Sequence, residues 1–327
     1  MLRARIIGTG SAVPDKILTN LDLEKIVDTS DEWITSRTGI KERRIASEGE
    51  YTSTFATRAA ENALAMAGVD PADVDLILVA TVTPDFPFPA TAFLVQNNIR
   101  ATKAVAFDIS AACSGFLYGI SVVEKFIRTG SAKKALVIGA ETLTRIVDWT
   151  DRNTCCLFGD GAGAVLLEAH EGDDRGILST HIHSDGSYWE LLHQPGVGSR
   201  NPACQKTIDE KLTFINMQGN EVFKLAVRAM EEAANEALDT NNLKTGDIDL
   251  FIPHQANRRI IDAIGKRLGL SDRQLYVNLE RYGNTSSASI PIALDEVCRA
   301  GRIKEGDIVL FDAFGGGLTW GSVLVRW

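Results

Sequence analysis

The stretch Asp73-Val-Asp-Leu-Ile-Leu78 returns in the second half of the chain as Asp247-Ile-Asp-Leu-Phe-Ile252. The helical pattern containing Ala59-Ala-Glu-Asn-Ala-Leu64 is likewise echoed by Ala233-Ala-Asn-Glu-Ala-Leu238. A repeat of about 170 residues is too long for a solenoid and indicates a duplicated domain. The sequence therefore predicts that the chain folds as two related halves.

Strand-like and helical patterns alternate along both halves. The strand-like runs include residues 4–8, 76–81, 104–109, 135–139 and 164–167, and helical patterns cover 54–67 and 115–128. This alternation predicts an α/β fold in which helices cover sheets. We expect an N-terminal half at 1–172, a C-terminal half at 173–327, and a long covering loop over the Pro- and Gly-rich stretch 183–206.

The composition is that of a globular protein and excludes several function classes. Of 327 residues, 45% are hydrophobic and 24% charged, which argues against disorder. A net charge of −9 argues against a general nucleic-acid binder, because phosphate contacts need a basic face. The apolar runs are too short to cross a bilayer, and the N-terminus lacks a signal-peptide pattern. Five cysteines, an odd number, are typical of a reducing compartment, so we expect a cytoplasmic protein without nucleic-acid or membrane partners.

Cys113 is the candidate nucleophile, within Phe107-Asp-Ile-Ser-Ala-Ala-Cys-Ser-Gly-Phe116. It follows a strand-like run and opens a helical pattern, so its thiol faces free N–H donors and the positive end of a helix. Both features favour the thiolate, the form that attacks carbonyl carbon. The small neighbouring residues leave room for a substrate. From this local context alone, a buried core cysteine is an equally good interpretation.

The duplication brings two further residues toward Cys113. When the halves are aligned by the ends of matching helices, at Arg128 and Arg299, Asn284 falls opposite Cys113. His254 falls at the C-terminal end of the strand that matches 76–80, and function in α/β sheets concentrates at such ends. A cysteine with His and Asn partners favours a catalytic site over a core cysteine.

Four stretches together resemble the β-ketoacyl-acyl-carrier-protein synthase III family of thiolase-fold condensing enzymes. They are Phe107–Phe116, Pro253-His-Gln-Ala-Asn257, Arg281–Pro291 and Phe314-Gly-Gly-Gly-Leu-Thr-Trp-Gly321. The resemblance runs from Ile6 to the C-terminus. It implies a duplicated thiolase-like α/β fold, five-layered as α-β-α-β-α with two pseudo-symmetric halves, and a homodimer.

The resemblance also implies an activity, that of the initiating condensing enzyme of type II fatty acid synthesis. Cys113 would take an acyl group, expected to be acetyl, from acyl-CoA. The backbone N–H groups of Cys113 and Gly316 would stabilise the thioester oxyanion. His254 and Asn284 would hydrogen-bond the thioester oxygen of malonyl-acyl-carrier protein as it loses CO2, and the resulting enolate would attack the acyl group. Since decarboxylation supplies the carbanion, neither a metal nor another cofactor is expected.

The same resemblance assigns residues to substrate contacts. Trp33 and Arg152 would sandwich the adenine of coenzyme A, with Arg37 and Asn257 at the phosphate and pantetheine region. The acyl pocket would be lined by Phe88, Phe158 and Phe314, with Phe88 reaching across the dimer. Taken singly, each of these residues also fits an ordinary core, surface or interface position.

A basic segment offers a surface for the carrier protein. Residues 254–281 contain six basic and three acidic side chains inside an acidic chain. Arg259 and Lys266 are seven positions apart and share a helix face, with Arg267 beside them. Because acyl carrier proteins are acidic, this face would steer them toward the site. A solvated helix face is the alternative interpretation.

Two other functions remain open at this point. One is a same-fold acyltransferase or condensing enzyme of secondary metabolism, because primer and acceptor depend on pocket shape. The other is a non-catalytic acyl-CoA-binding scaffold. The presence of Cys113, His254, Asn284 and the glycine run argues against the scaffold.

Overall fold

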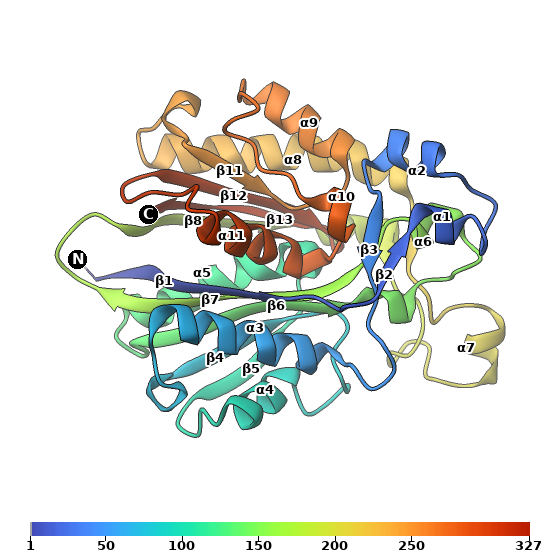
Figure 1. The fold of residues 1–327 in the computed structure, drawn as a ribbon, viewed down its shortest axis with the longest axis horizontal. Coiled ribbons are helices and arrows are strands. Elements are labelled where there is room, and N and C mark those ends of the chain that lie inside the picture. The colour runs from blue at the N-terminus through green and yellow to red at the C-terminus, as the bar shows by residue number, and fades with distance from the viewer. Residues whose placement is uncertain (1) are drawn as a thin grey trace.

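The computed structural model describes residues 2–327, which fold into five layers of helices and sheets (Figure 1). The N-terminal half supplies a sheet of five strands in the order β1 (Arg3–Ala12), β7 (Asp160–His170), β6 (Lys134–Thr142), β4 (Leu76–Ala80) and β5 (Val105–Ile109). Every residue of β4 is buried, as expected of a continuous apolar run covered on both faces. β4 runs parallel to β5 and β6.

The C-terminal half supplies the second sheet, in the order β11 (Leu250–Pro253), β12 (Ile308–Gly315), β13 (Thr319–Arg326) and β8 (Gly176–Ser184). Helices α5 (Gly115–Arg128) and α11 (Ser289–Arg299) lie between the two sheets (Figure 1). The outer layers are α3 (Thr52–Ala67) with α4 (Thr91–Ile99), and α8 (Gly219–Thr240) with α9 (Arg258–Arg267). The expected five-layered α-β-α-β-α fold is confirmed.

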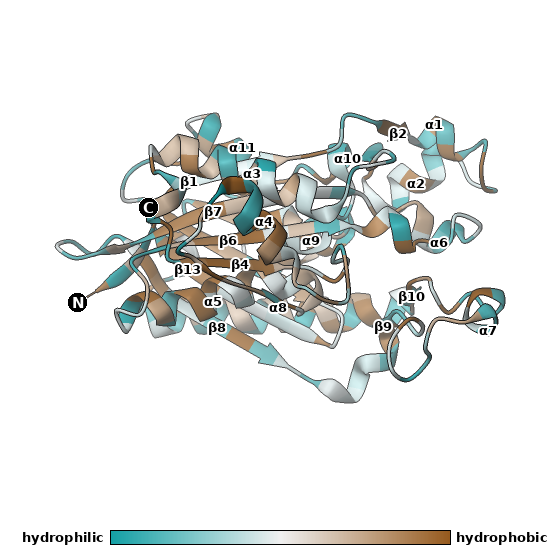
Figure 2. Cartoon of the chain, turned by 90° about the horizontal axis from the view of Figure 1, so that it is seen from below, coloured by the Kyte–Doolittle hydropathy of each residue, from teal (hydrophilic) through white to brown (hydrophobic). Residues whose placement is uncertain are grey.

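The core follows from this layering. Figure 2 shows apolar residues concentrated in the central strands. Phe116, Leu117 and Ile120 of α5 are fully buried in one cluster with Phe311 of β12, so the middle layer joins the two halves. The expected boundary after residue 172 falls between β7 and β8, where the chain passes from one sheet to the other.

Shorter elements gather at one end of the molecule (Figure 1). The helices and strands among them are β2 (Ile17–Thr19), α1 (Asn20–Leu23), α2 (Asp31–Thr38), β3 (Glu42–Arg44), α6 (Arg152–Cys155), β9 (Leu192–His193), α7 (Gln205–Asp209), β10 (Asn216–Met217) and α10 (Leu279–Tyr282). The 3₁₀ turns of the chain are η1 (Pro71–Asp73), η2 (Ala112–Ser114), η3 (Leu143–Ile146), η4 (Gly186–Leu191), η5 (Thr245–Asp247) and η6 (Ser286–Ala288). Within residues 2–327, no helix combines the length and apolar character that a bilayer crossing needs.

The spacing of the repeat is more regular than the ends of its helices suggest, and this corrects the expected match between Asn284 and Cys113. Matching residues lie 174 positions apart, as Asp73 and Asp247 do. Helix α11 has 11 residues where α5 has 14, so aligning the helix ends shifts the halves by three positions. At the regular spacing the counterpart of Cys113 is Ser287, not Asn284. The turns η2 and η6 confirm this alignment, since both begin with a non-glycine residue at positive φ.

Candidate active site

Cys113 lies in η2, between the end of β5 and the start of α5, and its side chain is almost completely buried. The preceding Ala112 has a φ of 45°, a strained conformation for a residue with a side chain. The backbone of Gly315 passes so close that a Cβ there would lie 2.6 Å from the Cys113 nitrogen. Only glycine fits at this position, which explains part of the glycine run.

Two cavities meet at Cys113. The larger has a volume of about 370 Å³, and the smaller about 140 Å³. Besides Cys113, both are lined by Phe158 and Leu192. The larger continues between apolar side chains and the glycine run, and its lining includes Val82, Leu143, Ile146, Ile215, Gly316 and Gly317. The smaller is lined by His254, Asn257, Asn284 and Phe314, among others. The structure therefore brings the three predicted catalytic residues to one cavity.

His254 follows β11 and is buried. Its Nδ1 lies 2.6 Å from the Ser289 hydroxyl at the start of α11. The same hydroxyl accepts a hydrogen bond from the Gln255 N–H at 3.3 Å, so its own hydrogen is free to point at Nδ1. Burial lowers the pKa of His254 to about 3, so the ring is neutral at ordinary pH.

Asn284 is fixed at both its backbone and its side chain. Its N–H donates to the Leu157 carbonyl at 2.8 Å, and its carbonyl accepts from Gly159 at 3.0 Å. The side-chain Oδ1 accepts from the Ser286 N–H at 2.8 Å. This contact fixes the orientation of the amide and leaves its NH₂ group as a donor.

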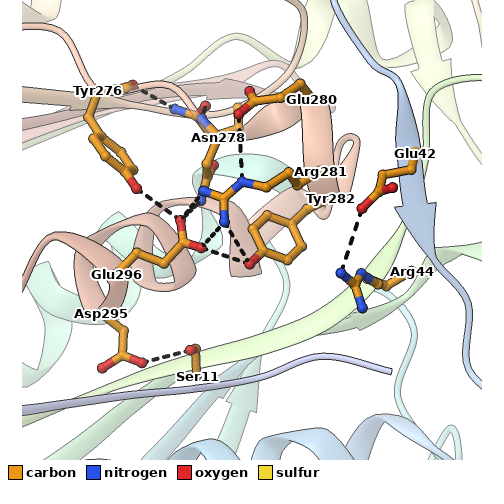
Figure 3. Close-up of polar contacts among 11 residues, drawn as sticks. Ser11, Glu42, Arg44, Tyr276, Asn278, Glu280, Arg281, Tyr282, Asp295 and Glu296 are labelled. Atoms are coloured by element: carbon orange, nitrogen blue, oxygen red, sulfur yellow. Dashed lines mark hydrogen bonds and ion pairs between the residues drawn. The ribbon is translucent and has the colours of Figure 1, made fainter. Parts of the chain in front are cut away.

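The chain segment leading to Asn284 is anchored by Glu296 of α11 (Figure 3). The Glu296 carboxylate accepts hydrogen bonds from the Tyr276 and Tyr282 hydroxyls at 3.0 and 2.7 Å and from Asn278 at 2.7 Å. Arg281 donates to both of its oxygens, at 2.7 and 3.0 Å. A bidentate guanidinium–carboxylate pair with three further donors makes a rigid base for the Asn284 loop.

The protonation state of Cys113 differs from the sequence-based expectation. Burial raises the pKa of the Cys113 thiol to about 12, and a hydrogen bond with Ser286 only partly opposes this effect. A thiol at a helix N-terminus was expected to favour the thiolate, but desolvation of the charged form outweighs that position. At rest, Cys113 is therefore a neutral thiol.

Three residues of the site were missed by sequence reasoning. Ser289 contacts His254, Ser286 contacts Asn284 and lines the larger cavity with Cys113, and Glu141 is the buried carboxyl whose charge most affects Cys113. The two serines belong to the same motif as Asn284, so their spacing could have suggested them. Glu141 is the next-to-last residue of an apolar strand, and an acid in that place is the signal that could have identified it.

The predicted coenzyme A residues form a cluster near the smaller cavity. Trp33 on α2 has the Arg37 guanidinium 4.7 Å and the Arg152 guanidinium 5.1 Å from its ring centroid. The Asn257 amide donates to the Arg37 carbonyl at 3.3 Å and also lines the cavity. The indole is thus already covered by two guanidinium groups, and an adenine ring would have to replace one of them.

The three predicted acyl-pocket phenylalanines have different surroundings. Phe158 lines both cavities, whereas Phe314 lines the smaller one and not the larger. Phe88 is 85% exposed and lines neither of these two cavities within the single chain. The covering segment 183–206 also differs from a plain loop. It contains η4 and β9, and its residues Trp189, Leu192 and His193 form one wall of the larger cavity.

The basic residues of α9 differ in their pairing. Arg267 pairs with Glu231 of α8, and Arg258 pairs with Asp262 at 2.7 Å. Arg259 and Lys266 are exposed, and neither has an ion-pair partner among residues 2–327. These two cations are therefore available to an acidic partner.

Comparisons with known proteins agree with the resemblance in the sequence. The family described as 3-oxoacyl-[acyl-carrier-protein] synthase III matches residues 107–186, and its C-terminal model matches residues 238–327. The chain is 56% identical to the β-ketoacyl-[acyl-carrier-protein] synthase III of Natranaerobius thermophilus over 329 residues, which covers 100% of both.

Solved structures show the same likeness. The 3-oxoacyl-[acyl-carrier-protein] synthase III of Aquifex aeolicus is 52% identical with a TM-score of 0.92, over 99% of this chain and 100% of that one. The priming β-ketosynthase of the R1128 polyketide pathway is 35% identical with a TM-score of 0.91, over 99% and 96%.

Proposed function

Because the chain belongs to the β-ketoacyl-[acyl-carrier-protein] synthase III family, we propose that it is the initiating condensing enzyme of type II fatty acid synthesis. Its substrates are acyl-CoA, expected to be acetyl-CoA, and malonyl-acyl-carrier protein. The observation that carries this proposal is the meeting of two cavities at Cys113. Both are lined mainly by apolar side chains, so either suits an acyl group. The smaller also contains His254 and Asn284, whose N–H groups would face a second thioester.

In the first half-reaction, the Cys113 sulfur attacks the acyl-CoA carbonyl carbon. The bond to the coenzyme A sulfur breaks, and the Cys113 proton ends on the released coenzyme A. The oxyanion would accept hydrogen bonds from the N–H groups of Cys113 and Gly316, beside a cysteine that is almost completely buried. The close approach of Gly315 to the Cys113 backbone supports this arrangement.

In the second half-reaction, malonyl-acyl-carrier protein loses CO2 and leaves an enolate. The Asn284 NH₂ group and the His254 Nε2–H donate hydrogen bonds to its thioester oxygen. The contact between Ser289 and Nδ1 favours the tautomer with the proton on Nε2. The enolate carbon attacks the acyl carbonyl, Cys113 leaves as thiolate and takes up a proton, and 3-oxoacyl-acyl-carrier protein is released. The chain's own residues suffice for these steps, without a metal or a further cofactor.

Coenzyme A would enter through the smaller cavity. The adenine would stack on Trp33 after displacing Arg37 or Arg152, whose charge would then face the phosphates. Asn257 lines that cavity and would contact the pantetheine.

The carrier protein would dock on the exposed face of α9. Reversing both Arg259 and Lys266 to Glu should lower turnover of malonyl-acyl-carrier protein about tenfold at low salt, because rim charges act mainly on association rate. Acylation of Cys113 by acyl-CoA should stay within about twofold of the wild-type rate. The wild-type rate with carrier protein should also fall as salt screens these charges. Turnover of malonyl-carrier protein and of malonyl-CoA, each at low and high salt, measures both effects.

The matched control is Arg258→Glu with Asp262→Arg, which reverses a paired site on the same helix. Equal loss with both donors would contradict docking at this face.

A second copy of the chain would pair along β5, one of the two edge strands of the N-terminal sheet. Val105 on this strand and Phe86, Phe88 and Phe93 nearby are exposed apolar side chains. Such an edge needs cover in a soluble protein. Sedimentation should therefore give the mass of two chains, and Val105→Lys should shift the protein toward one. A wild-type protein that sediments as a single chain at micromolar concentration would contradict the homodimer.

A condensing enzyme of secondary metabolism is the second candidate, favoured by the likeness to the R1128 priming β-ketosynthase. The higher identity to the fatty acid initiating enzymes supports the first. The two candidate functions differ in the product that they predict. Incubation with acetyl-CoA and malonyl-acyl-carrier protein should yield 3-oxobutanoyl-carrier protein by mass spectrometry. Product formation only with other primers or acceptors would favour the alternative.

A further inference from the structure

The two halves of the chain hold their site residues in different ways. Cys113 follows β5, which pairs with β4 along all five of its residues. In the C-terminal half, within the residues that the structure describes, the matching contact with β11 is a single bridge between Phe251 and Leu275. Beyond this bridge the chain leaves the sheet and forms α10 before it reaches Asn284. The position of this segment, 277–283, therefore depends largely on side chains.

Glu296 of α11 is the centre of the side-chain contacts that hold this segment (Figure 3). Its carboxylate accepts five hydrogen bonds, and all five donors lie between residues 276 and 282. The carboxylate is only 20% exposed, so these donors offset the cost of removing its charge from water. Burial raises the pKa values of the Tyr276 and Tyr282 hydroxyls to about 12, so both keep their protons and donate at ordinary pH.

The same network reaches His254 through Gln255 and Asn278. Gln255 directly follows His254 and is buried. Its Nε2 donates to the Tyr276 carbonyl at 3.3 Å, and its Oε1 accepts from the Asn278 N–H at 3.0 Å. The side-chain amide of Asn278 donates in turn to Glu296 at 2.7 Å. A continuous chain of hydrogen bonds therefore joins the residue after His254 to the carboxylate on α11.

Helix α11 contacts the surroundings of both predicted enolate-binding residues. Ser289 and Glu296 are seven positions apart, so they lie on one face of the helix. Ser289 lies 2.6 Å from the His254 ring, and Glu296 holds the segment that leads to Asn284. The position on α5 that matches Glu296 is Val122, which packs against the apolar core. The carboxylate therefore belongs to the half of the chain that carries both donors.

We propose that Glu296 is a positioning residue for decarboxylation, and that its network sets the spacing between His254 and Asn284. Both donors must reach the same thioester oxygen, so a shift of one relative to the other weakens their joint contact with it. A displacement of about 1 Å at a reacting group can cost about 100-fold in rate. Acylation of Cys113 does not depend on this spacing, because its oxyanion would be held by backbone N–H groups.

The test is Glu296→Gln, which keeps the size of the side chain but replaces one acceptor oxygen with a donor. Two or three of the five donors then lose their acceptor. The variant should release CO2 from malonyl-acyl-carrier protein about tenfold more slowly than wild type, with KM within about twofold, because the donors act on charge that develops in the transition state. Single-turnover acylation by acetyl-CoA should stay within about twofold of wild type.

The matched control is Glu280→Gln. Glu280 is an exposed carboxylate of α10 that pairs with the same guanidinium, that of Arg281, at 3.6 Å. The control makes the same chemical change beside the same cation but leaves the contacts of Glu296 in place. Both half-reactions should therefore remain near the wild-type rates.

A double variant separates positioning from a general loss of structure. In an Asn284→Ala background, Glu296→Gln should slow CO2 release by less than about threefold, because the segment then carries no donor to misplace. A tenfold effect that persists in this background would overturn the proposal. Equal losses in both half-reactions of the single variant, or an unchanged rate of CO2 release, would overturn it as well.

If Glu296→Gln does not fold, Tyr282→Phe decides, since it removes only one of the five hydrogen bonds. This variant should slow CO2 release about threefold and leave acylation unchanged, and any other pattern contradicts the role of the network. The inference rests on the proposed condensing activity. A wild type that takes no acyl group or releases no CO2 would instead refute that function.

Discussion

Cys113→Ser should form no detectable acyl-enzyme with acetyl-CoA, with the acylation rate falling by on the order of 10³ or more. The reason is the chemistry of the group rather than its size. A hydroxyl is much harder to ionise than a thiol, and His254, which lines the smaller cavity with Cys113, is a weak base because burial lowers its pKa to about 3. His254 therefore cannot supply the base that an alkoxide needs, although the serine fits the same space.

The matched control is Cys204→Ser, because Cys204 is exposed on the covering segment. This variant should acylate at the wild-type rate, and intact-protein mass with peptide mapping measures both. An acyl group that appears on the Cys113→Ser protein at the wild-type rate would show that another residue is the nucleophile.

His254→Ala and Asn284→Ala should affect the other half-reaction. Both side chains are donors toward the malonyl thioester oxygen, so each loss should slow decarboxylation by about 10²–10³. Acylation of Cys113 from acyl-CoA should survive within about tenfold, because its oxyanion is held by backbone N–H groups. The measurement is CO2 release from malonyl-acyl-carrier protein beside single-turnover acylation.

The control for this pair is His181→Ala, since His181 lies on β8 and contacts Glu236 rather than the cavities. It should leave both half-reactions near wild type. If His254→Ala, still folded, lost acylation and decarboxylation to the same extent, the division of labour between the two halves of the site would be wrong.

The fold and the meeting of Cys113, His254 and Asn284 at one site could be predicted from the sequence, because both depend on patterns of residue type. The repeated strand around Asp73 and Asp247 predicted two halves. The helical pattern over 115–128 predicted α5 with the bounds that the structure has, Gly115–Arg128. The regular spacing was misread at Asn284 because α11 is shorter than α5. A helix end is a poor reference point when one copy loses a turn.

Other features depend on burial, which a single sequence does not display. We expected a thiolate at Cys113, but burial raises the pKa of this thiol and favours its neutral form. Glu141 was missed because its role depends on the hydrogen-bond donors around it, which lie 58–146 positions away in the chain. The covering segment looked structureless by composition, yet Leu192 pairs in a short β-ladder with Met217 and walls the larger cavity.

The most direct measurement is a chase of the acyl-enzyme. The protein is incubated with acetyl-CoA, freed of excess, and then mixed with malonyl-acyl-carrier protein while intact mass is followed. We expect one acetyl group on Cys113 before the chase, and its loss in step with formation of 3-oxobutanoyl-carrier protein and CO2. An acetyl group that never forms, or one that malonyl-acyl-carrier protein leaves on the enzyme, would contradict an initiating condensing enzyme with Cys113 as its nucleophile.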